Sequence, residues 1–337
     1  MNARDAQARG AEIMTRTKVI SAVRDADHWA IQLEDVQSGA VLERRARVLV
    51  NAAGPWAGEV IRGVLRANSQ EQVRLVRGSH IVTRKLFDHD KCYFFQGSDG
   101  RIIFAIPYEQ DFTLIGTTDQ PHETADMRPH CTEDERDYLL NFASGYFKQA
   151  VTAGDIVWTY SGVRPLYDEG ASSATAATRE YVIKLDETGG EPVLNIFGGK
   201  ITTYRRLAEA AMDKIVPFLS PDTGIWTAGV PEPGGDFAVD GVAALTDELR
   251  AQVPFLAERD AARLIRAYGT DAAQIFAGMR QAADLGQDFG AGITARELDW
   301  AIKHEWVQSA EDYIWRRSKL GLRLTAEVSA FGRLAMV

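Results

Sequence analysis

Basic side chains stand near the ends of several expected strands in the middle of the chain. They are Arg77, His80, Arg164, Arg179 and Lys200. Forked guanidinium groups and ammonium groups are the side chains that bind a phosphate dianion. Arg164 directly follows the apolar run 155–163, where a solvated arginine is less expected. Together these cations would suit a small phosphorylated ligand. Taken alone, an arginine is usually a solvated surface charge, and a histidine such as His80 is more often a core residue than a catalyst.

Two glycines, Gly198 and Gly199, precede an expected helix over 200–216. Backbone N–H groups at the start of a helix lack partners within it, and the helix dipole favours negative charge there. The segment is not a P-loop, because Leu194 and Ile201 stand where that motif requires Gly and Ser or Thr. Such a helix start suits a developing anion, for example that of a reduced flavin ring. A simple glycine turn is the alternative.

A strand that is apolar on both faces ends at a run of small residues. The segment 46–54 reads ARVLVNAAG, as expected for a strand inside a parallel sheet. Pro55 follows at the first position of a helix that we expect to reach residue 66. Small residues allow a ligand to approach closely, or they form only a tight connection. A GxGxxA match at 290–295 follows no strand, so we interpret it as a loop between helices.

The remaining pattern predicts sheets followed by a helical region. Thr132 and Glu135 form a capping box for a helix to about residue 148. The segment 220–236 is rich in Pro and Gly and marks a boundary. Expected strands cover 18–24, 29–35, 41–50, several stretches between 73 and 118, 155–163, 180–185 and 193–197. Expected helices cover 3–10, 238–252, 258–267, 270–281, 295–308, 310–318 and 324–335.

Composition narrows the class of partner. The chain has 337 residues, of which 38 are Lys or Arg and 47 are Asp or Glu, so its net charge is −9. This acidic balance argues against nucleic acid as the main partner. Cys92 and Cys131 have no metal-ligand spacing, and the six histidines form no zinc motif, so we expect no metal site. No apolar run reaches the length of about 18 residues that a membrane span requires.

Several segments together resemble one enzyme family. They are RGSH, IPYEQDFTLIGTTD, DIVWTYSGVRPL, TREY, FGGKITTYRRLAEAAMDKI and HEWVQSAEDYIWRRSKLGL. In type, order and spacing they resemble the aerobic, FAD-dependent glycerol-3-phosphate dehydrogenases, over about residues 10–325. The last segment is similar to the helical cap of that family.

The resemblance implies an α/β fold with an added helical domain. A partial FAD-binding, Rossmann-like domain of the glutathione-reductase/D-amino-acid-oxidase type would comprise 1–66 and 193–219. A substrate-binding domain with an antiparallel sheet would comprise 67–192, and a helical C-terminal cap domain 220–337. Family members begin with a strand, a GxGxxG turn and a helix. No such unit precedes residue 1, so we expect an N-terminally truncated form.

The resemblance also implies oxidation of sn-glycerol 3-phosphate to dihydroxyacetone phosphate by hydride transfer to FAD, with a quinone as electron acceptor. His80, Arg164 and Lys200 would be catalytic, and these residues and Arg179 would bind the substrate. Expected FAD contacts are Val19, Ala53, Gly54, Trp56, Gly198, Gly199, Lys200, Ile201, Thr202 and Thr203. We expect a cytoplasmic enzyme, with peripheral contact to the inner face of the membrane and a homodimer as further options.

Two alternatives stay open on the sequence. The first is that the chain is an inactive fragment of this enzyme, whose incomplete sheet would expose an edge that tends to associate. The second is that it is a related FAD-dependent oxidase that passes electrons to oxygen. Flavin absorbance of the purified protein distinguishes an enzyme from an inactive fragment. Release of hydrogen peroxide under air distinguishes an oxidase from a dehydrogenase.

Overall fold

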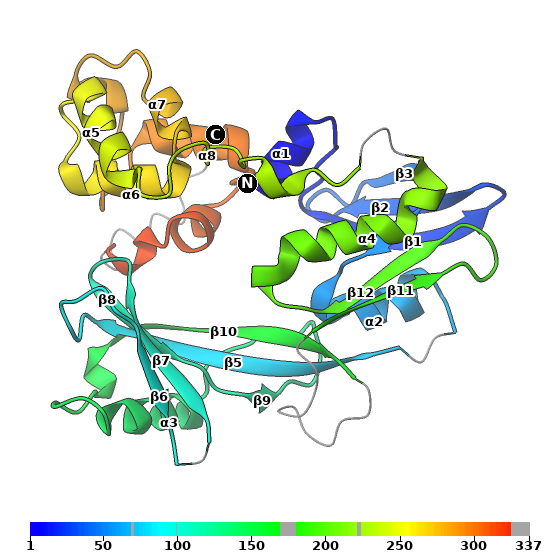
Figure 1. Ribbon diagram of the computed structural model, residues 1–337, viewed down its shortest axis with the longest axis horizontal. Helices are drawn as coiled ribbons and strands as arrows, with labels where there is room; N and C mark the ends of the chain where they lie inside the picture. Colours follow the sequence, from blue (N-terminus) through cyan, green and yellow to red (C-terminus); the bar gives the residue numbers. More distant parts are fainter. Residues whose placement is uncertain (69–70, 99, 169–179, 221–223, 325–337) are drawn as a thin grey trace. The chain divides into compact units, whose positions relative to one another are not determined.

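The computed structural model describes residues 1–68, 71–98, 100–168, 180–220 and 224–324. The chain forms two compact units (Figure 1). The first, which we call the helical unit, combines Met1–Thr15 with Trp226–Val337, and the second, the sheet unit, is Arg16–Ile225. This division does not separate the expected FAD-binding and substrate-binding segments from each other, so that finer boundary stays a prediction.

The sheet unit begins with a three-stranded antiparallel sheet. Its strands are β1 (Thr17–Asp25), β2 (His28–Asp35) and β3 (Val41–Ala46). Trp29 and Ala22 are buried on one face, where they pack with Val193. The expected single strand over 41–50 is instead two strands. Its first part joins this sheet as β3 and its last part, β4 (Leu49–Asn51), joins another sheet.

A large antiparallel sheet occupies the middle of the sheet unit, in the strand order β10-β5-β8-β7-β6 with β9 beside β5. The strands are β5 (Val73–Arg84), β6 (Tyr93–Gln96), β7 (Ile102–Tyr108), β8 (Phe112–Gly116), β9 (Gln120–Pro121) and β10 (Ile156–Tyr167). Helix α3 (Glu133–Ser144) covers one face, and Ile81, Ile103, Ile115 and Leu139 form the core between them. The capping box predicted at Thr132 and Glu135 is confirmed, with both of its hydrogen bonds present.

The third sheet contains the strand that was predicted to lie inside a parallel sheet. That prediction was wrong for the described residues, because β4 is an outer strand of a mixed sheet and Val50 is 46% exposed. Its order is β11-β12-β4, where β11 is Tyr181–Asp186 and β12 is Val193–Gly198, and β12 runs parallel to β4. Helix α4 (Tyr204–Leu219) packs against it through Ala211 and Ile215, which contact Leu194. The predicted helix over 56–66 forms, but as three short turns: η1 (Gly54–Trp56), α2 (Ala57–Glu59) and η2 (Val60–Val64).

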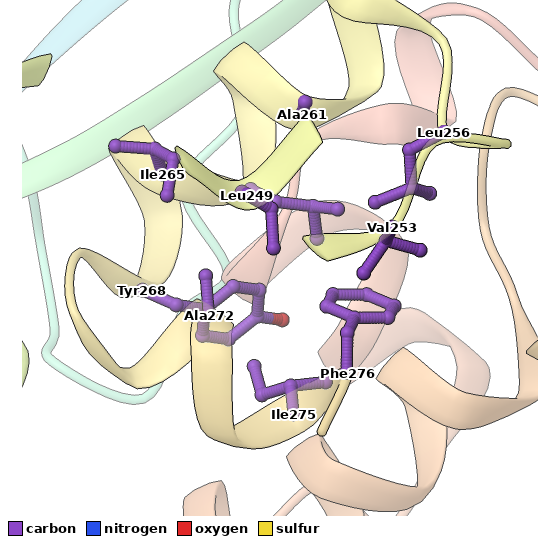
Figure 2. Packing of buried hydrophobic residues seen from close by; sticks show 10 residues of the cluster. Leu249, Val253, Leu256, Ala261, Ile265, Tyr268, Ala272, Ile275 and Phe276 are labelled. Carbon is purple, nitrogen blue, oxygen red and sulfur yellow. The ribbon is translucent and has the colours of Figure 1, made fainter. Parts of the chain in front are cut away.

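The helical unit contains α1 (Asn2–Ala8), α5 (Val242–Gln252), α6 (Glu258–Tyr268), α7 (Asp271–Ile275) and α8 (Ala295–Glu305). Figure 2 shows apolar side chains of this unit, among them Leu249, Val253 and Phe276, directed toward one another in a common core. Helix α1 is held by Arg4, which donates to Asp271 at 2.8 Å. Residues 290–294 form a loop leading into α8, as predicted. The expected helix over 324–335 lies almost entirely outside the described residues.

None of the described helices combines the length and the apolar composition that crossing a membrane demands.

Leu264 provides a test of the core of the helical unit. It is 1% exposed and belongs to the same cluster of buried residues, so replacing it by alanine leaves a cavity. We expect Leu264→Ala to lower the free energy of unfolding by about 2–5 kcal/mol in urea titrations followed by tryptophan fluorescence. Val239→Ala, at a fully exposed position of the same unit, should change it by less than about 0.5 kcal/mol. Equal effects of the two substitutions would show that Leu264 is not a core residue.

Candidate active site

His80 and Arg164 lie on the same face of the large sheet. Strands β5 and β10 are antiparallel neighbours, with His80 opposite Tyr160 and Val76 opposite Arg164. Side chains alternate between the two faces of a sheet with a period of two residues. The face that carries His80 and Arg164 is therefore the one opposite helix α3. The structure thus brings these two predicted site residues together.

His80 is held between neighbouring strands. Its imidazole stacks on Tyr160, with ring centroids 4.8 Å apart and planes 6° apart. Nδ1 is buried and has no hydrogen-bond partner among the described residues. Burial, and then the positive charge of Arg164, lower the pKa of His80 to about 4. Both effects disfavour the charged ring, so His80 is neutral at pH 7 and can accept a proton.

Arg164 is already oriented by polar groups at the end of β8. Its guanidinium donates to Asp119 Oδ1 at 2.5 Å and to Thr117 Oγ1 at 3.1 Å. The side chain is 31% exposed, so part of the guanidinium remains open to a ligand. An Arg fork with one carboxylate partner is fixed in direction and keeps further N–H donors. Sequence reasoning did not identify Asp119, because its pairing with Arg164 is long-range.

Arg77 was expected to join this cluster, and the structure contradicts that. Arg77 is two residues before Ser79, so both point to the α3 face, where Arg77 donates to the buried Glu135 at 2.9 Å. Glu135 also accepts hydrogen bonds from Ser79 Oγ at 2.8 Å and Thr118 Oγ1 at 2.6 Å. The two-residue period of the segment RGSH would have separated Arg77 from His80. This buried network, which we call the Glu135 network, fixes the backbone of β5 directly behind His80.

The ends of β4 and β12 lie side by side, and they carry the two glycine segments. Because the strands are parallel, the loops that follow them leave the same edge of the sheet, where α/β folds bind ligands. Asn51 and Asn195 are opposite each other and buried, and Asn51 Nδ2 donates to Asn195 Oδ1 at 2.9 Å. Asn51 also donates to the carbonyl of Ala57 at 3.0 Å, which fixes the loop containing Ala53 and Gly54.

Gly198 connects this edge to the large sheet. It has a φ of +67°, and a Cβ added there would lie 3.0 Å from the carbonyl oxygen of Glu180 and 3.6 Å from that of Pro165. Gly198 therefore packs against β10 at the residue that follows Arg164. A side chain at this position would crowd the carbonyl oxygen of Glu180, and the positive φ would strain any other residue, so the position favours glycine.

Other predicted residues have different surroundings. Lys200 Nζ lies 3.5 Å from Glu180 Oε1, and in the part of the chain that the structure describes no hydrogen bond or ion pair joins it to Arg164. Ile201 is 87% exposed at the start of η4 (Ile201–Thr203), which leads into α4. Thr203 Oγ1 donates to the carbonyl of Lys200 at 3.0 Å. Thr202 belongs to the same turn, and Arg179 lies outside the described residues.

Two other predicted FAD contacts, Val19 and Trp56, lie earlier in the chain. Trp56 is partly exposed and its indole N–H donates to Asp126 at 2.8 Å. Val19 is exposed on β1 and pairs with Leu33 of β2. Within the described residues no contact joins Val19 to the glycine segments.

The glycine segments have the properties that a flavin needs. A Cβ on Gly54, whose φ is +56°, would meet nothing within 4 Å, so the backbone there is open to a close ligand. The turn Ile201–Thr203 offers N–H groups at the start of a helix together with an exposed apolar side chain. Such N–H groups stabilise an anionic ring, and the apolar group suits a flat aromatic surface. The described residues contain no group of three or more His, Cys, Asp or Glu that could hold a metal ion.

Glu135 gives a pH-dependent prediction for the sheet behind the site. Burial alone would raise its pKa, but hydrogen bonds from Thr118, Thr132, Ser79 and Arg77 outweigh burial and lower the pKa to about 2. A lowered pKa stabilises the fold above the unfolded value of 4.5, and this contribution is lost as the pH falls from 4.5 to about 2. We expect Glu135→Gln to reduce the free energy of unfolding at pH 7 by about 3 kcal/mol.

The same substitution should also weaken the pH dependence of unfolding below pH 4.5. Glu133→Gln is the matched control, because Glu133 is in the first turn of the same helix but is 88% exposed. It should cost less than about 1 kcal/mol. Unfolding curves at several pH values compare the two variants. An unchanged acid dependence in Glu135→Gln would contradict the role of the network.

Comparisons with known proteins identify the family of this chain. Residues 1–205 match the family described as FAD dependent oxidoreductase, and residues 225–335 match the C-terminal domain of alpha-glycerophosphate oxidase. A glycerol-3-phosphate dehydrogenase of Pseudomonas aeruginosa is 43% identical over 326 residues, which is 96% of this chain and 63% of that protein. A D-erythritol 1-phosphate dehydrogenase of Brucella abortus is 40% identical over 332 residues, covering 98% of this chain and 66% of that protein.

A solved structure is similar over the same span. The glycerol-3-phosphate dehydrogenase from Bacillus halodurans, complexed with FAD, superposes with a TM-score of 0.81 at 27% identity, covering 97% of this chain and 64% of that chain. The chain thus spans slightly less than two thirds of the length of these relatives. The predicted fold class, an FAD-binding fold followed by a helical C-terminal domain, is confirmed. The chain belongs to the FAD dependent oxidoreductase family and carries the C-terminal domain of the alpha-glycerophosphate oxidase type.

Proposed function

We propose that this protein oxidises sn-glycerol 3-phosphate to dihydroxyacetone phosphate, with FAD as the hydride acceptor. One observation carries the proposal: a neutral imidazole and an oriented guanidinium share one sheet face, and the end of the strand that carries Arg164 lies against Gly198. The glycerol-3-phosphate dehydrogenases among the relatives support the choice of substrate.

Gly54, Ala53 and the segment 198–203 would hold FAD, because they combine an open backbone with a helix start. When bound, FAD supplies the acceptor for the hydride that leaves C2 of the substrate. The Gly198 segment lies next to the end of β10. A substrate that contacts Arg164 is therefore within reach of a cofactor seated at this edge.

His80 would act as the base that takes the proton of the C2 hydroxyl group. A base must be unprotonated before the reaction, and His80 meets that condition at neutral pH. A pKa of about 4 makes the imidazole a weak base in the free protein. The negative charge of a substrate phosphate would offset the field of Arg164 and raise this pKa. Substrate binding therefore strengthens the base when it is needed.

Arg164 would polarise the C2 oxygen as the carbonyl forms, because its open N–H donors stabilise negative charge on that oxygen. We propose that Lys200 helps Arg164 after leaving Glu180, which it approaches on the exposed surface. Arg179 would bind the phosphate group as a guanidinium fork.

A longer polyol phosphate is the second candidate substrate. The Brucella relative is named as a D-erythritol 1-phosphate dehydrogenase, and it is about as similar to this chain as the Pseudomonas relative. Both names describe phosphorylated polyols, so the same set of cations suits either substrate. For the electron acceptor we propose a quinone, with peripheral membrane contact and a homodimer as parts of the same proposal.

The direct experiment mixes the purified protein with FAD and then adds each substrate without oxygen. We expect flavin absorbance to remain with the protein after gel filtration and to bleach on addition of glycerol 3-phosphate. A stronger response to D-erythritol 1-phosphate would favour the second candidate. Reoxidation by a soluble quinone supports the dehydrogenase, and hydrogen peroxide release under air would favour an oxidase. A protein that retains no flavin, or that neither substrate reduces, would contradict the proposal.

His80→Ala tests the proposed base. Loss of general base catalysis should lower the turnover of glycerol 3-phosphate by about 10²-fold. His130→Ala serves as the control, because His130 is exposed and belongs to no part of the proposed site. Steady-state assays with a dye acceptor measure both variants. Turnover by His80→Ala within about threefold of the unmodified protein would remove His80 from the role, since the expected loss is much larger.

A further inference from the structure

Three glycines lie on the same sheet face as His80 and Arg164. Gly78 is two residues before His80 and is opposite Gly162 of β10, and Gly116 of β8 is opposite His80. The period of two residues places their missing side chains on the face that carries the proposed catalytic groups. Glycine is unfavourable inside strands because it weakens pairing and offers no side chain to pack. Its presence at these three positions therefore requires a local reason.

The reason at two positions is direct steric contact. A Cβ on Gly116 would lie 2.2 Å from Cδ2 and 2.7 Å from Cγ of His80. A Cβ on Gly78 would lie 2.5 Å from Nη2 of Arg164 and 2.6 Å from Oγ1 of Thr117. All four distances are far below van der Waals contact. The imidazole therefore lies against the backbone of β8, and the guanidinium lies against the backbone of β5.

The third position differs from the other two. A Cβ on Gly162 would meet no described atom within 4 Å. Gly162 lies between Tyr160 and Arg164 along β10, so the space above it is open where the two other glycines are covered. The same sheet face thus has two occupied glycine positions and one open one.

We propose that Gly78 and Gly116 are positioning residues, which fix the guanidinium of Arg164 and the imidazole of His80 flat against neighbouring strands. The inference rests on the proposed function only for its catalytic meaning. As a statement about side-chain positions it can be tested without FAD or substrate. Any side chain at Gly116 would push the His80 ring away from β8 and out of its stack on Tyr160, while one at Gly78 would move Arg164 away from Thr117 and Asp119.

The groups around His80 determine how its titration would respond. Tyr160 and Arg164 belong to β10, and Asp119 follows β8 and pairs with Arg164. Tyr108 of β7 interacts with Tyr160, and burial raises the pKa of both phenols, so both are uncharged near neutral pH. Moving the ring toward water would remove its desolvation, which is the larger of the two causes that lower its pKa. The titration of His80 therefore reports the position of its ring.

The first experiment follows the histidine resonances of the full chain by NMR across pH. His80→Asn identifies the His80 signal by its loss. In Gly116→Ala the pKa of His80 should rise from about 4 toward the ordinary value of 6.5. Gly162→Ala is the matched control, because its new methyl group strikes no described atom, so the His80 titration should stay unchanged. A His80 signal that titrates alike in Gly116→Ala and the unmodified protein would overturn the proposal.

The second experiment keeps the proposal testable if Gly116→Ala folds poorly. The predicted clash involves the His80 ring, so truncating that ring should relieve it. We expect Gly116→Ala to reduce the folding equilibrium constant at least about tenfold more in the unmodified background than in the His80→Ala background. Gly78→Ala in the Arg164→Ala background should show partial relief, because the contact with Thr117 remains. Equal costs in both backgrounds for Gly116→Ala would show that the glycine serves the backbone alone.

Turnover separates this inference from the proposed function. If both hold, Gly116→Ala lowers kcat for glycerol 3-phosphate and shifts the pH profile along with the His80 titration. A displaced ring in Gly116→Ala together with normal turnover by His80→Ala would sustain the positioning role and contradict the catalytic one. A normal position of the His80 ring in Gly116→Ala, together with low turnover by His80→Ala, would contradict the positioning role and sustain the catalytic one.

Discussion

The antiparallel pairing of β5 with β10 is the constraint on which the rest of the site depends. These two strands are each 12 residues long, and their register determines which side chains share a face. A slip of one residue would move His80 to the α3 side and bring Arg77 and Ser79 to the open face. The register therefore places His80 and Arg164 on the open face. It places Arg77 and Ser79 on the other face, where they donate to Glu135 of α3.

Each of the two arginines, Arg77 and Arg164, is paired with a carboxylate, which offsets the cost of placing its charge in a partly buried location. Glu135 neutralises Arg77 on the covered face, and Asp119 neutralises Arg164 on the open face. Breaking a buried ion pair by removing one partner is strongly destabilising, since the remaining charge stays buried. Arg164 differs because its pair is about one-third exposed on each side. That pair can exchange partners with an anionic ligand, whereas the pair of Glu135 is part of the fold.

Much of the fold could be predicted because its signals are local. The capping box at Thr132 and Glu135, the glycine segment before α4 and the loop at 290–294 depend on residues close in the sequence. The split of 41–50 into β3 and β4 was missed, because both parts are extended and only their pairing partners in different sheets separate them. His80 and Arg164 were singled out as basic residues near strand ends, and the family resemblance then implied their catalytic roles.

The interactions that orient the site could not be predicted in the same way. Asp119, Glu135 and the glycines opposite His80 and Arg164 act through partners on other strands, so no local pattern reveals them. Arg77 was included with the other cations because charge alone was considered and the alternation of side chains along the strand was not. Applying that alternation to RGSH would have excluded it before the structure was known.

A crystal structure of the protein with FAD and glycerol 3-phosphate would test the central claim most directly. The account predicts the polyol on the open face of the large sheet, with its C2 oxygen within hydrogen-bond distance of His80 and Arg164. The flavin ring should lie at the Gly54 and Gly198 segments. A substrate bound elsewhere, for instance on the α3 face beside Arg77, would contradict the account.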